Sequence, residues 1–200
     1  MPENDVIAAG ARTAIRTPRP ADEEEFLARA RDSAELHHPW LSPPATPADY
    51  RAYLERLGEP QTEGFLVCER ESGAIAGYVT INAIVRRAFL SGALGYGAFV
   101  PYAGRGHMSA GIGLVVRYAF THLGLHRLEI NVQPGNAASI ALAKRAGFRL
   151  EGFSPDYLFI DGAWRDHERW ALTTEMTAET TAGTTAGTEP GTGRAPGGAR

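Results

Sequence analysis

The stretch VPYAGRGHMSAGIGLVV, residues 100–116, places four glycines around a single arginine, Arg105. It joins an aromatic-rich apolar run to apolar residues with helical spacing, so it predicts a strand, a glycine-rich loop and a helix in that order. Glycine at such a junction lets a ligand or another backbone approach the main chain closely. Either a phosphate-bearing ligand binds the unpaired amides of the helix start, or the glycines only allow the helix to pack on the strand.

Two common nucleotide-binding motifs do not fit this loop. A Walker loop needs the pattern GxxxxGK followed by Ser or Thr, which the chain lacks. A dinucleotide fingerprint that starts at Gly104 and Gly106 needs a third glycine at position 109, where the chain has Ser109. The loop alone therefore leaves a pyrophosphate site and a simple packing turn equally open.

Composition narrows the class of protein. The 200 residues suffice for one compact domain, and the net charge of −3 with a pI of about 6.1 gives no overall attraction to nucleic acid or to anionic membranes. From the apolar pattern we expect neither a membrane span nor a signal peptide. Cys68 is the only cysteine, which excludes an internal disulfide and a CxxC metal site. We expect a cytoplasmic protein in which the Cys68 thiol packs in the core.

The two ends of the chain differ in composition from its middle. Residues 174–200 are mostly Thr, Ala, Gly and Pro with almost no large apolar side chain, which predicts a disordered tail. Residues 1–12 are expected to form a flexible N-terminus. The folded domain is therefore predicted to cover residues 13–173.

Inside this domain, segments with strand periodicity and segments with helical periodicity follow one another. Thr46 followed by Pro47 and Asp49 is typical of a helix start with a capping box. Gly124 and Gly147 are expected to end two later helices. The strands are expected at residues 13–18, 64–70, 74–85, 89–100, 127–133, 148–160 and 163–173, and the helices at 21–36, from Thr46 onward, at 104–122 and at 137–146. This order predicts an α/β fold with a single mixed, mainly antiparallel sheet of about seven strands flanked by about four helices.

A more specific signal comes from three stretches, GYGAFVPYAGRGHM, GLHRLEINVQPGNAASIALAKRAGFRLEG and DYLFIDGAWRDHERWAL. Together they resemble the GCN5-related N-acetyltransferase (GNAT) superfamily, and within it the RimJ/RimL branch, which acetylates protein N-termini including those of ribosomal proteins. The resemblance runs in order through nearly all of residues 13–173. It implies the GNAT fold and acetyl-CoA as the acetyl-donor co-substrate, with no metal.

The resemblance also implies where acetyl-CoA would bind. The main chain of five consecutive loop residues would hold the pyrophosphate, and the pantetheine arm would run alongside Phe99 and Val100 as an added strand. Asn136 would lie on the pantetheine side, and Ser139 near the sulfur of the cofactor. The five loop residues are Gly104, Arg105, Gly106, His107 and Met108.

The chain departs from the family pattern at three positions. Pro101 stands where the superfamily loop often has glutamine or arginine, and a proline donates no amide hydrogen bond. Ala110 replaces a helical glutamate, and Ala143 replaces the tyrosine that many members use as an acid. The last departure moves the expected acid role to Ser139, as in RimL-like patterns.

The acceptor amine must be neutral to attack a thioester, so a base is expected. Asp156, in the segment SPDYL, matches the place where RimL-like enzymes carry an acidic residue and is the candidate base. The alternative is that Asp156 only caps a turn after Pro155. Trp40 follows Pro39 in a loop that resembles the RimJ loop beside the acceptor groove. It is a candidate substrate contact, or else a hydrophobic plug over the core.

The resulting hypothesis is an acetyl-CoA-dependent N-acetyltransferase that transfers the acetyl group directly to a primary amine. The favoured acceptor is the N-terminal α-amine of a protein, such as a ribosomal protein. The alternatives are an acetyltransferase for a small amine, such as an amino acid or an aminoglycoside, and a non-catalytic acyl-CoA-binding module. We expect a monomer or homodimer that binds neither nucleic acid nor membrane.

Overall fold

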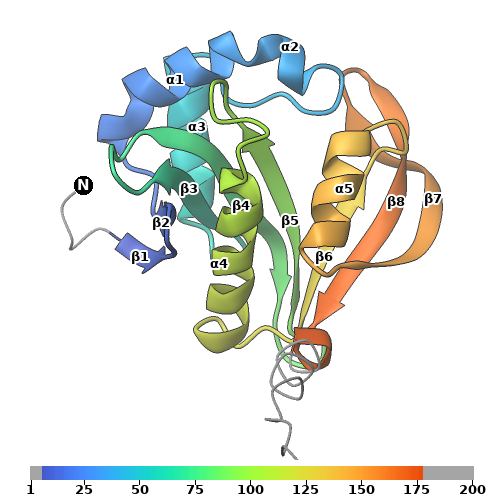
Figure 1. Ribbon diagram of the computed structural model, residues 1–200. Helices are drawn as coiled ribbons and strands as arrows, with labels where there is room; N and C mark the ends of the chain where they lie inside the picture. The colour runs from blue at the N-terminus through green and yellow to red at the C-terminus, as the bar shows by residue number, and fades with distance from the viewer. Residues whose placement is uncertain (1–5, 178–200) are drawn as a thin grey trace, which may run out of the picture.

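The computed structural model describes residues 6–177, and these form one sheet flanked by helices (Figure 1). The strands are β1 (Val6–Ala9), β2 (Thr13–Arg16), β3 (Glu63–Glu69), β4 (Ile75–Val85), β5 (Ser91–Ala98), β6 (Arg127–Val132), β7 (Arg149–Ile160) and β8 (Ala163–Thr173). The helices are α1 (Glu23–Asp32), α2 (Ala34–His37), α3 (Pro47–Leu57), α4 (His107–Thr121) and α5 (Ala137–Arg145), with a 3-10 turn η2 (Pro20–Asp22) before α1.

All eight strands belong to one sheet in the order β1-β2-β3-β4-β5-β6-β8-β7. Neighbouring strands are antiparallel except for β5 and β6, which are parallel. The predicted class, an α/β fold with a mixed and mainly antiparallel sheet, is therefore confirmed. The sheet has eight strands where about seven were expected, and the additional one is β1. This strand lies in the segment expected to be loose, and it is ordered because Ile7 and Ala8 pack against the main core cluster.

The first predicted helix, residues 21–36, is divided in the structure. Ser33 separates α1 from α2. The Ser33 hydroxyl donates a hydrogen bond to the carbonyl oxygen of Arg29 at 2.7 Å, and such a bond to the preceding turn competes with regular helix geometry. The start of α3 matches the prediction, since the Thr46 hydroxyl accepts from the Asp49 amide at 3.2 Å.

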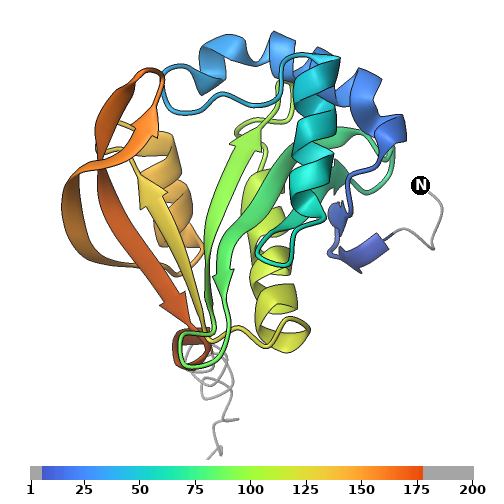
Figure 2. The ribbon, with the colours of Figure 1, turned by 180° about the vertical axis from the view of Figure 1, so that it is seen from behind.

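Helices cover both faces of the sheet. α4 and α5 lie on the face nearer the viewer in Figure 1, and α3 lies on the opposite face, which Figure 2 shows. Ile112 and Val115 of α4 belong to one buried cluster, and Phe26 of α1 belongs to a second cluster together with Tyr50 and Tyr53 of α3. The sheet is therefore the middle layer of a three-layer arrangement around β2 to β5.

Cys68 lies in the second cluster and is fully buried, which confirms the predicted core position. Burial raises the pKa of its thiol to about 11, so the thiol is protonated at neutral pH.

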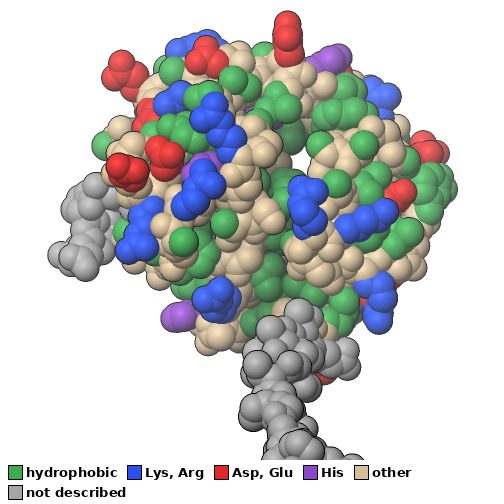
Figure 3. Space-filling view, in the orientation of Figure 1, with side chains coloured by type: hydrophobic (Ala, Val, Ile, Leu, Met, Phe, Trp, Pro, Cys, Tyr) green, Lys and Arg blue, Asp and Glu red, His purple; other side chains and the backbone are tan. Residues whose placement is uncertain are grey.

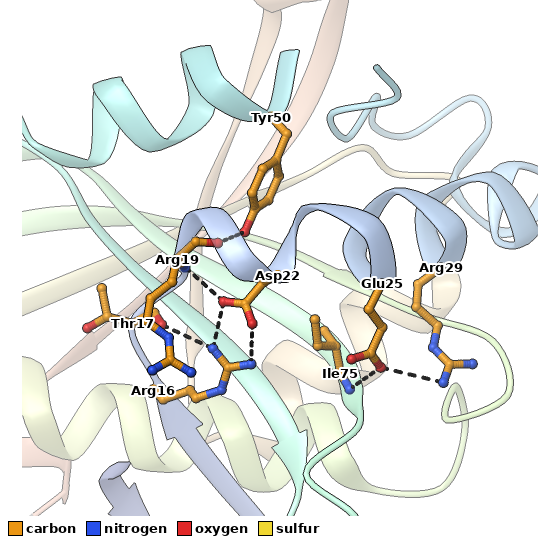
Figure 4. Close-up of polar contacts among 8 residues, drawn as sticks. All are labelled: Arg16, Thr17, Arg19, Asp22, Glu25, Arg29, Tyr50 and Ile75. Carbon is orange, nitrogen blue, oxygen red and sulfur yellow. Dashed lines mark hydrogen bonds and ion pairs between the residues drawn. The ribbon is translucent and has the colours of Figure 1, made fainter. Parts of the chain in front are cut away.

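Two polar contacts fix α1 to the sheet (Figure 4). The guanidinium of Arg16 in β2 donates two hydrogen bonds to the Asp22 carboxylate, both at 2.7 Å, and both side chains are buried. The Ile75 amide at the start of β4 donates to the Glu25 carboxylate at 2.9 Å. A bidentate buried pair of this kind holds two elements in one relative orientation.

The parallel strands β5 and β6 pair over only part of their length. Their register joins Ser91 to Arg127 and ends, within the described residues, with Leu94 opposite Ile130. The two strands then separate and leave a gap between β5 and β6 (Figure 2). At the same height the space-filling view shows an opening between the two halves of the molecule (Figure 3).

The last strand pair forms an exposed ribbon. β7 is the free edge of the sheet, and almost all of its residues are exposed. Its register with β8 shifts between Leu150 and Gly152 and again between Ser154 and Leu158. Asp156 lies in the second irregularity with a φ of 46°.

Residues 174–177, at the start of the predicted tail, are helical, and the rest of that predicted tail lies outside the described residues. In residues 6–177 no helix is long and apolar enough to cross a membrane. The same residues contain no group of three or more His, Cys, Asp or Glu side chains placed to hold a metal ion.

Candidate active site

The glycine-rich loop turns the main chain at Gly104 and Gly106. Their φ angles are 76° and 86°, a conformation that glycine adopts without steric cost. Gly106 is also the N-cap of α4. A Cβ atom added at either glycine would meet nothing within 4 Å, so open space lies directly over the main chain. The loop therefore leaves open space over Gly104 and Gly106, called the glycine recess below, in which a ligand can approach the backbone closely.

The main-chain amides of this loop are available to such a ligand. Within residues 6–177, the amides of Gly104, Gly106, His107 and Met108 have no hydrogen-bond partner. Free amides at a helix N-terminus carry a partial positive charge and bind anions such as phosphate. Arg105 is exposed beside them and adds a full positive charge. The recess, the amides and the charge fit a pyrophosphate group.

Two buried side chains hold the loop in place. The His107 ring lies within hydrogen-bond distance of the Thr13 hydroxyl, with Nδ1 and Oγ1 3.0 Å apart, and it meets the Tyr102 ring edge to face. Met108 is buried against Gly77 of β4. Because these side chains point into the core, His107 and Met108 can contribute only their main chain to a ligand.

β5 directs the main-chain groups of its even-numbered residues toward the gap. The carbonyl oxygen of Leu90, just before β5, accepts from the Arg127 amide of β6 at 3.1 Å. Because direction alternates along a strand, Tyr96 and Ala98 face the same side. The Ala98 carbonyl oxygen lies 2.7 Å from Nε2 of His37. Burial lowers the pKa of His37, so the neutral ring donates from Nε2 to that carbonyl.

Phe99 and Val100, the residues expected beside the pantetheine arm, already use their main-chain amides. Phe99 is fully buried, and its amide donates to the carbonyl oxygen of Ala76 in β4 at 2.9 Å. The Val100 amide donates to the Ser33 hydroxyl at 3.0 Å, while the Val100 side chain is exposed. A ligand on this edge is therefore expected to pair with the main chain of Tyr96 and the amide of Ala98, whose carbonyl oxygen already accepts from His37, and to touch the Val100 side chain.

Ser139 and Tyr96 meet across the gap. Asn136 is the N-cap of α5, and its side-chain oxygen accepts from the Ser139 amide at 3.0 Å. The Ser139 hydroxyl lies 2.6 Å from the hydroxyl of Tyr96 in β5. Burial raises the pKa of Tyr96, although the hydrogen bond with Ser139 opposes this rise. The sequence analysis did not single out Tyr96. The signal that could have revealed it is a tyrosine between two glycines, Gly95 and Gly97, in the strand that precedes the glycine-rich loop.

A cavity of about 350 Å³ lies between α1, α2, the loop after α2 and the turn between β7 and β8. Apolar side chains such as Ala34 and Leu41 line it together with His37, and Asp161 reaches it from the β7–β8 turn. The Nδ1 atom of His37 is buried and has no hydrogen-bond partner in the described part of the chain. This cavity offers a place for a ligand, and none of its lining residues belongs to the glycine-rich loop.

Trp40 lies in the loop that closes the gap at its upper end. The Gln133 side chain donates to the Trp40 carbonyl oxygen at 3.3 Å, and a Cβ atom on Gly135 would be 3.0 Å from the Trp40 ring. The segment of residues 38–45 thus crosses from the helices of the first half to the β6–α5 loop (Figure 1). Trp40 is half-buried there, and its ring lies against Gly135 of the β6–α5 loop.

Asp156 is exposed on the outer ribbon and is not brought into contact with Ser139 or Trp40 by any hydrogen bond among the described residues. Its amide donates to the Asp166 carboxylate at 2.9 Å. The carboxylate that accepts a main-chain hydrogen bond in this irregular turn therefore belongs to Asp166, and the Asp156 side chain is exposed to solvent.

Free amides at the start of a helix, beside two separating strands, form an arrangement that suits an extended ligand carrying a pyrophosphate. A family model described as acetyltransferase (GNAT) domain matches residues 12–149. The chain therefore belongs to the GNAT acetyltransferase family, as the sequence motifs predicted.

Individual relatives agree with this assignment. The chain is 34% identical over 132 residues to the ribosomal protein uS5-alanine N-acetyltransferase of Escherichia coli strain K12, covering 64% of this chain and 68% of that protein. It is also 34% identical over 116 residues to the probable N-acetyltransferase YjcK of Bacillus subtilis strain 168, covering 58% of this chain and 64% of that protein. The chain thus spans just under two thirds of the Bacillus relative.

The fold agrees as well. Mycobacterium smegmatis RimJ in complex with CoA-disulfide superposes with a TM-score of 0.76 at 26% identity, covering 86% of this chain and 89% of that one. The ribosomal-protein-S5-alanine acetyltransferase of Vibrio fischeri gives a TM-score of 0.75 at 25% identity, covering 86% and 98%. The predicted enzyme class, N-acetyltransferase, matches the names of these relatives.

Proposed function

We propose that this protein transfers the acetyl group of acetyl-CoA to the N-terminal α-amine of a protein, with a ribosomal protein as the favoured acceptor. The observation that carries the proposal is the presence of two separate candidate ligand sites in one domain. Open space lies over Gly104 and Gly106 beside the free amides at the start of α4, and a cavity with other lining residues lies beside His37. Two substrates held in separate sites of one domain can be brought together for direct transfer.

Acetyl-CoA is assigned to the recess. The amides of Gly104, Gly106, His107 and Met108 would bind its pyrophosphate, with Arg105 as a counter-charge. The arm of the cofactor would then continue along the gap-facing edge of β5.

The arm has two further groups of neighbours in this proposal. Val100 and Phe99 form the wall on the β5 side, where Val100 offers its exposed side chain and Phe99 backs the wall from the core. Asn136 and Ser139 of α5 form the wall on the other side. The Ser139 hydroxyl is assigned to the sulfur, to which it would supply a proton as the thiol leaves.

The chemistry of the acceptor favours an α-amine. An α-amino group has a pKa of about 7.8 and a lysine side chain one of about 10.4. Near pH 7.5, deprotonation therefore costs under ~1 kcal/mol for the α-amine and about 4 kcal/mol for lysine. An exposed carboxylate such as that of Asp156, working through water, is a sufficient base for the first but a weak one for the second.

The acceptor is assigned to the cavity beneath residues 38–45. Its apolar lining suits a short uncharged side chain at the first position of a peptide, and Trp40 closes the passage toward the β6–α5 loop. One relative supports a different acceptor, because the spermidine N(1)-acetyltransferase of Escherichia coli strain K12 is 25% identical over 158 residues. A polyamine has several positive charges, whereas Asp161 is the one carboxylate among the described residues that line the cavity, and Arg31 lies there as well.

Release of free CoA from acetyl-CoA tests the proposal. We expect release with peptides that begin with Ala or Ser, and none above background with the same peptides carrying a blocked N-terminus. Release with spermidine or free amino acids, but not with peptides, would replace the proposal by a small-amine acetyltransferase. Binding of acetyl-CoA without CoA release from any acceptor would indicate a binding module.

A further inference from the structure

The hydroxyl groups of Tyr96 and Ser139 form a bridge between β5 and α5. Their oxygen atoms are 2.6 Å apart, beyond the point where the pairing of β5 with β6 ends. Neither hydroxyl has another hydrogen-bond partner in residues 6–177. The bridge therefore joins the two walls of the gap with one short hydrogen bond.

The direction of this hydrogen bond follows from the acidities of the two groups. A phenol, with a pKa of about 10, is a stronger donor than the aliphatic hydroxyl of serine. Burial raises the pKa of Tyr96, so the phenol keeps its proton at neutral pH. Tyr96 is then the donor and Ser139 the acceptor, which leaves the Ser139 hydrogen free to point at a third atom.

A second hydrogen bond, separate from the one with Tyr96, holds the main chain of Ser139. Its amide is held by the Asn136 side chain at 3.0 Å, so the first turn of α5 cannot rotate freely. Ala143, one turn further along α5, is fully buried and carries no polar group. At Ala143, therefore, α5 has no hydroxyl to offer, whereas Ser139 has one that contacts Tyr96.

We propose that Tyr96 is a positioning residue for acetyl transfer, which donates its hydroxyl hydrogen to Ser139 and so directs the Ser139 hydrogen at the departing sulfur of CoA. This inference rests on the proposed function, which places Ser139 beside that sulfur. Tyr96 acts only through Ser139 and touches no reacting atom.

The protons balance along this path. The amine nitrogen forms a bond to the acetyl carbon, and the carbon–sulfur bond breaks with its electron pair left on sulfur. Ser139 gives its hydroxyl proton to the sulfur and takes the proton of Tyr96. The surplus proton of the new amide nitrogen leaves to the base and then to solvent, and solvent returns one proton to Tyr96. No oxidant or further reactant is needed.

Tyr53 offers a matched control for removal of a tyrosine hydroxyl. It is buried, and its hydroxyl lies 3.4 Å from the Thr80 hydroxyl, within the cluster that packs under α3. Tyr53→Phe removes the same group as Tyr96→Phe, from a similar environment, at a distance from the gap. Thermal midpoints of all variants establish that they are folded.

The first measurement is binding, and it needs no acceptor. Calorimetry compares CoA with desulfo-CoA, which lacks the thiol. We expect the wild-type protein to prefer CoA by about 2- to 10-fold, the range of one neutral hydrogen bond. The preference should vanish in Ser139→Ala, shrink in Tyr96→Phe and persist in Tyr53→Phe. If Tyr96→Phe fails to fold, Ser139→Thr must retain the preference that Ser139→Ala loses.

The second measurement is the kinetics of a double-variant cycle. Tyr96→Phe should lower kcat about 10-fold or more, with KM values for acetyl-CoA and acceptor changed less than about 3-fold. Adding Tyr96→Phe to Ser139→Ala should change kcat by less than about 2-fold, because the Ser139 hydroxyl through which Tyr96 acts is already absent. Effects that multiply in the double variant would show that Tyr96 does not act through Ser139 and would overturn the inference.

The two hypotheses fail in different ways. If the wild-type protein binds neither CoA nor acetyl-CoA, the proposed function is wrong, and the inference falls with it. If it binds both, and Ser139→Ala loses the preference for CoA over desulfo-CoA while Tyr96→Phe keeps it in full, the inference alone is wrong.

Discussion

The two walls of the opening differ in how they are held. On the β5 side, β2 and β3 are buried along almost their whole length, and apolar clusters pack on both faces of the sheet. On the other side, β7 is exposed at almost every position and changes register twice against β8. The loop that offers main-chain amides continues from the buried wall, whereas Asp156 and Asp161 lie on the exposed ribbon.

This difference suits two different tasks. Binding through main-chain amides needs a backbone held in one geometry, which a wall with a core on both faces supplies. Selecting an acceptor depends on side chains that can be exchanged without loss of the fold, and an exposed ribbon tolerates such exchange. We therefore expect substitutions on the ribbon to act on catalysis and acceptor choice. Substitutions on the buried wall are expected to act on stability and donor binding, except at Tyr96, whose hydroxyl reaches Ser139 from β5.

The largest effect is expected at Asp156 on the ribbon. If its carboxylate is the base, Asp156→Asn lowers kcat by about 10²–10⁴-fold while the affinity for acetyl-CoA stays the same. The loss should shrink as the pH rises past about 7.8, because more of the acceptor α-amine is then neutral. Profiles of kcat/KM against pH with one N-terminal peptide measure both effects.

Asp166→Asn is the control for this prediction. It makes the same change on the same ribbon, and its side-chain oxygen can still accept from the Asp156 amide. We expect it to retain activity within about 3-fold. If Asp156→Asn is nearly fully active at about pH 7, water rather than Asp156 is the base.

The next effect contrasts the stability of the two walls. Asp22→Asn leaves the buried Arg16 without its partner charge, and breaking a buried pair costs about 3–5 kcal/mol. Phe153→Ser on the ribbon replaces a side chain that is 53% exposed, and it should cost about 0.5 kcal/mol or less. Urea unfolding of the two variants measures the difference. Equal losses in the two variants would contradict the contrast between a buried and an exposed wall.

A smaller effect is expected at the donor loop. Gly106→Val fills the open space over the main chain and is strained at a φ of 86°, so it should weaken acetyl-CoA binding by about 10-fold or more. Calorimetry on the folded variant measures the affinity. Gly113→Ala, at an exposed helical glycine with open space around it, should leave the affinity unchanged. An unchanged affinity in folded Gly106→Val would remove the basis for this binding site.

The parts of the structure that the sequence predicted are those with local causes. Thr46 caps α3 through a residue three positions away, and Gly104 and Gly106 turn the loop because of their own backbone freedom. The order of strands and helices follows from periodicity within each segment. Such signals lie within a few residues of the structure that they determine.

The parts that were missed depend on contacts between distant segments. Tyr96 and Ser139 are 43 positions apart, and His37 meets the Ala98 carbonyl across 61 positions. No local pattern of apolar residues encodes either contact. The formation of β1 also depends on distant contacts, because a four-residue strand is stable only through its packing on the core.

The smallest effect concerns the end of the chain. A chain that ends at Thr177 should keep its thermal midpoint within about 1 °C and its affinity for acetyl-CoA, because residues 178–200 are mostly Thr, Ala, Gly and Pro and have no large apolar side chain to bury. A chain that ends at Thr173 also loses Met176, which packs partly buried against the main cluster, and the ion pair of Glu175 with His126. Its midpoint should fall by about 2–4 °C, as expected for the loss of ~1 kcal/mol of apolar burial. Scanning calorimetry of both chains separates these steps. A large fall for the chain ending at Thr177 would mean that residues 178–200 dock on the domain, and the exposed ribbon would then be the first place to look for their contacts.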